Sequence, residues 1–206
     1  MDQMSRTQDL TFAPDRPVLV KPLRASREAV EAAADALGAR LGFAPGEKLE
    51  EAVARLGGRI HRGGPNLWFR NQRLSFLADA PDRFELHLLG IATPARARLD
   101  LAHELGHFVL HDLALRREHG EGIRTAAPSM VSPHDAEGQR ADLEAFWFAH
   151  QILMPAAAFR EAWADGARDI SAEDRLHRMA TRFGVPMRSA EVRAEFLGLE
   201  TSQQAA

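Results

Sequence analysis

Residues 101–111 read LAHELGHFVLH and contain the spacing H-E-x-x-H. On a helix, residues four apart lie on the same face about 6 Å apart along the axis, so the imidazoles of His103 and His107 can bind one cation. Glu104 follows the first histidine and can face a water molecule at that cation without binding the cation itself. The stretch therefore predicts a catalytic zinc site on a helix.

A catalytic zinc site needs one more protein ligand than this stretch supplies, because such sites have three protein ligands and a water molecule. The chain contains no cysteine, so the third ligand must be His, Asp or Glu. His111 lies about 12 Å from His103 along the helix axis, too far for both to bind one ion together with His107. We expect His111 to support a ligand or to lie at the helix end, and the third ligand to come from another helix.

The composition indicates a globular protein of one large domain, or of one domain with a small appendage. The chain has 206 residues, of which 45% are hydrophobic and 27% charged, and a formal net charge of -3. This charge does not favour a protein that coats nucleic acid. Neither a signal-peptide core nor a run of about 20 apolar residues is present, so we expect a cytoplasmic protein without membrane contact.

A group of basic and aromatic residues offers an alternative binding surface. The group consists of Arg59, Arg62, Arg70 and Arg73 with Trp68 and Phe69. Such a group can bind nucleic acid through charge and stacking. We favour a solvated strand face with aromatic residues in the core, and therefore expect no direct nucleic-acid binding.

The pattern of apolar residues predicts an α+β fold that is mainly helical, with a small antiparallel sheet and a C-terminal helical hairpin. Helices are expected over 26–41, 47–56, from Pro94 through the H-E-x-x-H stretch, over 140–154, in a short segment around 159–165, from Ser171 to Gly184 and over 187–199. Strands are expected over 58–62, 67–71, 73–78 and 83–89. Residues 117–138 are rich in Gly, Pro and Ser and are expected to form a long mobile loop next to the site.

Three ordered blocks of the sequence resemble the ImmA/IrrE metallopeptidases. The blocks are LAHELGHFVLH (101–111), DLEAFWFAHQILMP (142–155) and MATRFGVPMRSAEVRAEFLGL (179–199). The resemblance implies a zincin-like metallopeptidase fold that binds one Zn²⁺ per chain. The polar opening with two prolines predicts a flexible N-terminal arm (1–22), and the resemblance implies a zincin-like core (23–164) and a C-terminal helical hairpin packed on that core (165–199), followed by a tail (200–206).

The second block departs from the family pattern at two positions. Alignment places the family's ligand Glu at Asp142 and its supporting Asn or Asp at Phe146. Asp can bind zinc, although its side chain is one methylene shorter, so the two helices would have to approach more closely. Glu144 is the alternative ligand, and it points about 200° away around the same helix. We favour Asp142, and expect the acid that does not bind the metal to be a solvated charge.

The resemblance implies a zinc-dependent endopeptidase whose substrate is a regulatory protein, typically a helix-turn-helix transcriptional repressor. Glu104 would act as general base, and His134 or His119 of the 117–138 segment is a candidate to stabilise the oxyanion, because the chain has no tyrosine. The alternative is a weak or inactive module that binds a repressor or a toxin-antitoxin partner without cleaving it. A zinc hydrolase acting on another bond is a third possibility.

Overall fold

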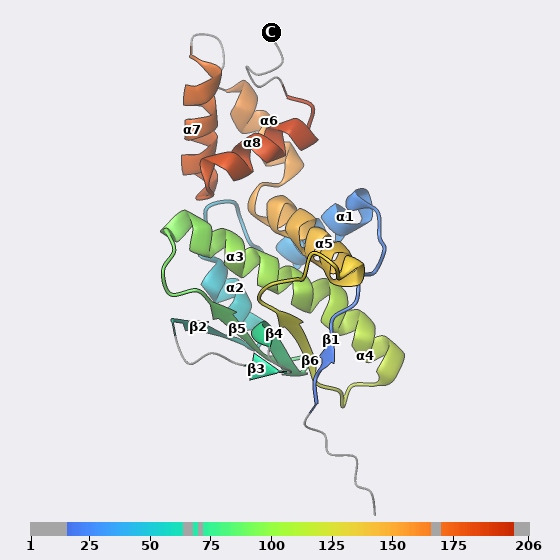
Figure 1. The fold of residues 1–206 in the computed structure, drawn as a ribbon. Coiled ribbons are helices and arrows are strands. Elements are labelled where there is room, and N and C mark those ends of the chain that lie inside the picture. Colours follow the sequence, from blue (N-terminus) through green and yellow to red (C-terminus); the bar gives the residue numbers. More distant parts are fainter. Residues whose placement is uncertain (1–15, 64–67, 70–71, 166–169, 200–206) are drawn as a thin grey trace, which may run out of the picture.

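The computed structural model describes residues 16–63, 68–69, 72–165 and 170–199 (Figure 1). Its elements, in chain order, are β1 (Val18–Leu19), α1 (Arg27–Leu41), α2 (Leu49–Arg55), β2 (Gly58–Arg62), β3 (Trp68–Phe69), β4 (Gln72–Ala80), β5 (Arg83–Leu88), α3 (Pro94–Gly106), the π-helix η1 (His107–Asp112), α4 (Leu113–His119), β6 (Thr125–Pro128), α5 (Ala136–Leu153), α6 (Ala156–Ala164), α7 (Ala172–Phe183) and α8 (Met187–Phe196). The α+β class and the C-terminal helix pair, α7 with α8, agree with the sequence analysis.

Local capping explains where several helices begin and end. The side chains of Ser26, Thr93 and Ser171 each accept a hydrogen bond from a backbone amide in the first turn of α1, α3 and α7. Gly42 and Gly184 adopt the left-handed conformation directly after α1 and α7, with φ of 57° and 62°. These boundaries confirm the sequence predictions, because a cap depends only on neighbouring residues.

The sheet is mixed, so the expectation of an antiparallel sheet is wrong. Its strand order is β1-β6-β4-β5-β2, and β3 pairs with β4 outside this path. Strand β4 is antiparallel to β5 and β6, whereas β1 runs parallel to β6 and β2 runs parallel to β5. Each edge strand pairs with a strand that is not its neighbour in sequence, and a parallel partner of this kind gives no hairpin signal.

Two strands lie in segments for which no structure was expected. The 1–22 segment contains β1, although residues 1–15 are outside the described part of the chain, as is the 200–206 tail. The 117–138 segment contains the end of α4, all of β6 and the start of α5, so it is not one long loop. Both strands are short, and they are defined by pairing with distant residues, which apolar spacing within the segment does not reveal.

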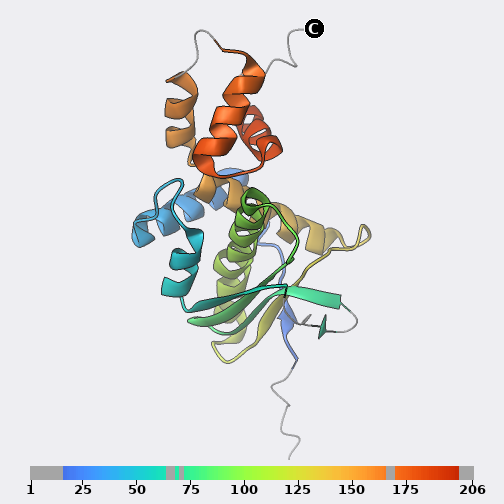
Figure 2. The same cartoon turned by 90° about the vertical axis from the view of Figure 1, so that its left-hand side faces the viewer.

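The helices form a layer over one face of the sheet. Helix α3 contacts β5 and packs against α5, which in turn packs against α1 (Figures 1 and 2). Helices α6, α7 and α8 lie at the end of the molecule farthest from the sheet in both views. None of the helices in the described ranges is both long and apolar enough to cross a membrane.

Candidate metal centre

The three candidate ligands come from two packed helical segments. His103 is in α3, His107 opens η1 directly after it, and Asp142 is in α5. Asp142 Oδ1 lies 3.0 Å from His103 Nε2 and 3.6 Å from His107 Nε2. The donor atoms of the three residues all lie within 4.8 Å of one another. The structure thus brings the two histidines of the H-E-x-x-H stretch together with Asp142.

This donor set fits a zinc ion. Ligand bonds of about 2.0–2.1 Å in a tetrahedral site place neighbouring donor atoms about 3.3 Å apart. The two measured distances, 3.0 and 3.6 Å, lie on either side of that value. Two imidazoles and one carboxylate would occupy three positions and leave the fourth for water or substrate, which is the pattern of catalytic zinc sites.

A close helix approach compensates for the short side chain of Asp142. Gly106 of α3 faces Ala145 of α5, and a Cβ atom at position 106 would lie 3.1 Å from the Cα atom of Ala145 and 3.2 Å from its carbonyl oxygen. Such contacts are tighter than most real Cβ contacts, so a larger residue at position 106 would require the helices to move apart by a few tenths of an ångström. Asp142 is one turn before Ala145 on α5, so its carboxylate is carried close to the histidines.

Burial and the short contacts perturb all three ligand pKa values. Burial would lower the pKa of His103, but the hydrogen bond with Asp142 and the charges of Glu104 and Asp142 outweigh it and raise that pKa. Burial lowers the pKa of His107 to about 3, which keeps this imidazole neutral. Burial opposes ionisation of Asp142, yet its hydrogen bonds to the two histidines hold its pKa below the ordinary value. A neutral imidazole and an ionised carboxylate are the forms that bind metals.

Glu104 is buried beside this cluster. It lines a cavity of about 1000 Å³ together with His103, Asp142 and Phe146. Burial raises the pKa of Glu104 to about 7, although the charge of His103 and a hydrogen bond from Ser75 act in the opposite direction. A carboxyl group with this pKa can accept and release a proton near neutral pH.

Ser75 holds Glu104 in place and was not found by the sequence analysis. Its hydroxyl donates a hydrogen bond of 2.8 Å to Glu104 Oε2. Ser75 lies where the register between β4 and β6 shifts, between Leu74 and Phe76. Such an irregularity can redirect a side chain. No motif marks this serine, because the shift depends on how β4 pairs with a distant strand.

His111 and Glu144 form a chain of contacts behind His107. His107 Nδ1 lies 3.0 Å from His111 Nδ1, and His111 Nε2 lies 3.1 Å from Glu144 Oε2. Glu144 also accepts hydrogen bonds from the backbone amides of Leu23 and Ala25. His111 and Glu144 are fully buried, so the expectation that the second acid is a solvated charge is wrong.

One arrangement of protons leaves His107 free to bind a metal through Nε2. Its Nδ1–H donates to His111 Nδ1, and His111 Nε2–H then donates to the Glu144 carboxylate. Carboxylates that accept a hydrogen bond from a ligand histidine orient the ring and fix its tautomer. Here a second histidine extends that connection, which requires the carboxylate to be ionised. The pKa of Glu144 is lowered accordingly: burial opposes this, but the hydrogen bonds from His111 and Leu23 outweigh it.

Comparison with protein families identifies the chain. Residues 85–195, more than half of the protein, match the peptidase M78 model, described as the IrrE N-terminal-like domain. The chain belongs to the M78 peptidase family. Membership of this metallopeptidase family agrees with a His and Asp cluster inside the matched region.

Comparisons with individual proteins add less about this M78 family member. No curated protein matches it. Among solved structures, a Mycobacterium tuberculosis transcriptional regulator matches with 18% sequence identity and a TM-score of 0.48, over 79% of this chain and 45% of that one. The M78 family chain thus corresponds to less than half the length of that regulator.

The other residues of this M78 family chain that the sequence analysis considered for the site are not part of the metal cluster. His134 and His119 are exposed, and neither lines the cavity. Phe146 lines the cavity, and its ring contacts the rings of His150 and Phe196. Arg73 and Arg96 line the cavity and are candidates to stabilise a developing oxyanion.

The basic and aromatic group is only partly described. Arg59 is exposed, and Arg62 pairs with Glu50 at 2.7 Å. Arg70 and the side chains of Trp68 and Phe69 lie outside the described residues. The group therefore stays a sequence-based hypothesis.

Proposed function

We propose that this protein is a zinc-dependent endopeptidase that binds one zinc ion through His103, His107 and Asp142. The observation that carries the proposal is the convergence of Asp142 Oδ1 on both imidazole Nε2 atoms, beside the buried carboxylate of Glu104. Membership of the M78 family supports a peptide bond as the bond that is cleaved.

The residues of the site would divide the chemistry as follows. Bound zinc would polarise the scissile carbonyl and lower the pKa of a water molecule. Glu104 would take the proton from that water and pass it to the leaving amine, while the Ser75 hydroxyl keeps Oε2 in place. Glu104 Oε1 makes no hydrogen bond within the described residues, so it is free for this transfer. Arg73 or Arg96 at the cavity wall would stabilise the negative charge on the carbonyl oxygen.

We infer that the substrate is a regulatory protein, most simply a helix-turn-helix repressor. The sequence resemblance to the ImmA/IrrE metallopeptidases suggests this substrate class. The cavity also contains apolar wall residues, Leu88, Leu89, Leu99 and Met130, beside the charged cluster. A site of this kind can hold apolar side chains of an extended or partly unfolded segment on either side of the scissile bond.

A second candidate function is a regulatory module that binds its partner without cleaving it. Phe146 favours this alternative, because it stands where the family pattern has a polar residue and packs against His150 and Phe196 instead. Loss of a polar group that supports a ligand weakens metal binding in other sites.

Substitution of Glu104 distinguishes the two functions. Glu104→Gln should keep zinc and the fold but lose roughly 10²–10⁴-fold in cleavage rate, because the amide cannot accept the proton. The assay incubates wild type and variant with helix-turn-helix repressors of the same organism and with unfolded casein, each with and without chelator. Equal cleavage by wild type and Glu104→Gln would rule out this mechanism. Bound zinc without cleavage of any repressor would favour the binding module, and efficient digestion of casein without preference would exclude a selective regulator.

A further inference from the structure

Three further side chains of types that bind metals lie together on the face of the sheet that points away from the helices. His61 of β2 and His87 of β5 are direct partners in the parallel pairing of these strands, and Glu85 is two residues before His87. In β5, Phe84, Leu86 and Leu88 are buried in the core, whereas Glu85 and His87 alternate with them and are partly exposed. Because successive side chains of a strand point to opposite faces, the group faces away from that core.

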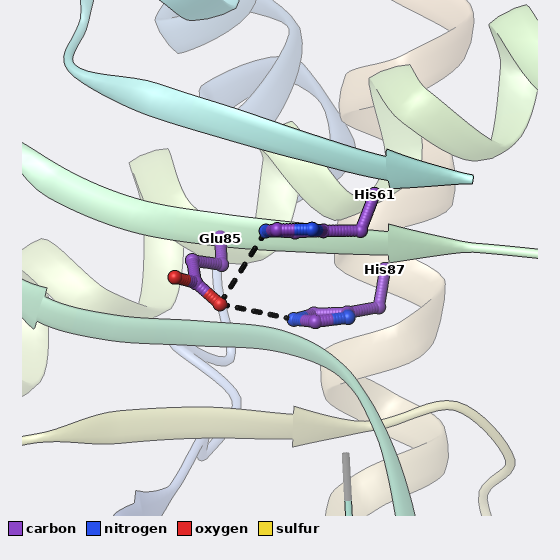
Figure 3. A group of neighbouring side chains, drawn as sticks. All are labelled: His61, Glu85 and His87. Atoms are coloured by element: carbon purple, nitrogen blue, oxygen red, sulfur yellow. Dashed lines mark hydrogen bonds and ion pairs between the residues drawn. The ribbon is translucent and has the colours of Figure 1, made fainter. Parts of the chain in front are cut away.

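The three side chains point toward a common space, as Figure 3 shows. Glu85 Oε2 lies 3.5 Å from His61 Nε2 and 3.3 Å from His87 Nε2. The two imidazole rings stack, with centroids 4.6 Å apart and planes inclined by 12°, so both Nε2 atoms are presented from the same side. All three donor atoms lie within 4.8 Å of one another. Donor atoms of a tetrahedral zinc site lie about 3.3 Å apart, close to both measured distances.

One imidazole nitrogen of the group has no hydrogen-bond partner among the described residues and could bind a metal ion. His61 Nε2 is buried and makes no hydrogen bond within the described part of the chain, although its ring faces a carboxylate. Two imidazoles and one carboxylate are a ligand combination that zinc and other transition metals bind.

We propose that His61, Glu85 and His87 form a second divalent-metal site, suited to zinc or another transition metal that prefers imidazole ligands. The site shares no residue with the His103, His107 and Asp142 cluster, and it does not depend on the proposed peptidase activity. Three protein ligands leave one position open to water or to a group of a partner. Because β2 is the edge strand of the sheet, the ion would fasten that edge to β5.

An ion bound to His61, Glu85 and His87 would also affect the cavity that contains Glu104. His87 and the adjacent Leu88 both line the cavity that contains Glu104. An ion that fixes β2 to β5 would therefore brace the wall of this cavity to which His87 belongs. We expect metal at the second site to stabilise the fold even when the first centre is empty.

Metal stoichiometry of the full-length protein tests the proposal. Apo protein, prepared with chelator, is titrated with Zn²⁺ by calorimetry and with Co²⁺ by visible absorption. Wild type should bind two ions, His61→Ala and Glu85→Gln one, and His103→Ala one. His177→Ala, an exposed histidine of α7, is the matched control and should bind two. If His61→Ala and His103→Ala each lose one of the two ions, the protein has two separate sites. One ion in wild type that persists unchanged in His61→Ala and Glu85→Gln would overturn the proposal.

Thermal unfolding tests the bracing role separately. In the His103→Ala background, the melting temperature should rise with Zn²⁺ concentration, since a ligand that binds only the folded state stabilises it. Adding His61→Ala should abolish this rise while circular dichroism shows an intact fold. His61 is partly exposed on an edge strand, so its truncation should be tolerated. A melting temperature of folded His103→Ala that does not respond to Zn²⁺ would contradict the bracing role.

Discussion

Two acidic residues on α5 have opposite surroundings, although only one residue separates them. Asp142 faces His103 and His107, whereas Glu144 points to the other side of the helix and contacts His111 and the segment before α1. Residues two apart on a helix are rotated by about 200°, so the two acids cannot serve the same centre. Substitution of Asp142 should therefore affect metal binding, and substitution of Glu144 should affect the stability of the fold.

Asp142→Ala should abolish tight zinc binding with little effect on the stability of the apo protein, because Asp142 is half exposed. Glu144→Ala should destabilise the apo protein by at least about 1–3 kcal/mol, since it leaves the buried His111 without this partner and also removes the acceptor of two part-buried backbone amides. Zinc content at saturating metal and urea unfolding with chelator measure the two effects. If Glu144→Ala lost zinc while Asp142→Ala kept it, the ligand would be Glu144.

A buried histidine should make the fold sensitive to acid. Burial, and less strongly the charge of Arg193, lower the pKa of His150 to about 4, against about 6.5 in the unfolded chain. The unfolded state then binds more protons, so stability from this group is complete above pH 6.5 and falls as the pH drops toward 4. Between pH 7 and pH 5 the loss should be about 2 kcal/mol.

Urea unfolding of wild type and His150→Gln at both pH values, with chelator present, isolates this contribution. The free-energy difference between the two proteins should shift by this amount in favour of the variant at pH 5. An identical pH dependence in the two proteins would mean that His150 does not titrate in this way.

Some of the structural features that form the site can be predicted from the sequence, and others cannot. The His103 and His107 pair could be predicted because both residues belong to one continuous helical segment, where spacing determines geometry. Family alignment suggested Asp142, but only the close packing of α3 and α5 at Gly106 explains how its short side chain reaches the histidines. Ser75, the parallel edge strands and strand β6 depend on long-range pairing, which no local pattern encodes.

The π-helix η1 places His111 where it supports His107. Wider turns of this kind are frequent at functional sites. His111→Ala should weaken zinc binding roughly 10–100-fold, as loss of a group that orients a ligand histidine typically does. Competition with a zinc-binding chelator dye gives the dissociation constant, and His119→Ala, exposed at the end of α4, is the control. A dissociation constant equal to that of the control would remove His111 from the metal centre.

The larger of two hydrophobic clusters in the described residues joins the sheet, the central helices and the C-terminal helix pair. Buried residues of this cluster come from every layer, including Phe76, Leu105, Phe148, Phe183 and Ala190. The length and composition indicated a globular protein of one large domain, or of one domain with a small appendage. One part of how the last two helices attach could not be predicted, because it involves a buried charge of α8 whose partners lie in distant elements.

This charge is Arg193. Its side chain is fully buried, and its guanidinium donates hydrogen bonds to the Met154 carbonyl at 3.0 Å, to Glu31 at 2.7 Å and to Gln151. Removing the guanidinium leaves the Met154 carbonyl and Gln151 without this partner, and two such groups together typically cost roughly 2–6 kcal/mol. Arg193→Ala should therefore lower the free energy of unfolding by about this amount.

The control for Arg193→Ala is Arg188→Ala on the same helix, where the exposed arginine pairs only with Glu191 and Glu195 at the surface. Exposed pairs of this kind contribute little, so this variant should unfold like wild type. Urea unfolding followed by circular dichroism and by tryptophan fluorescence should give coincident transitions if the helix pair and the rest of the core unfold together. Arg193→Ala should shift both transitions equally. A shift no larger than that of Arg188→Ala, or a separate early transition already present in wild type, would show that the helix pair is only loosely attached.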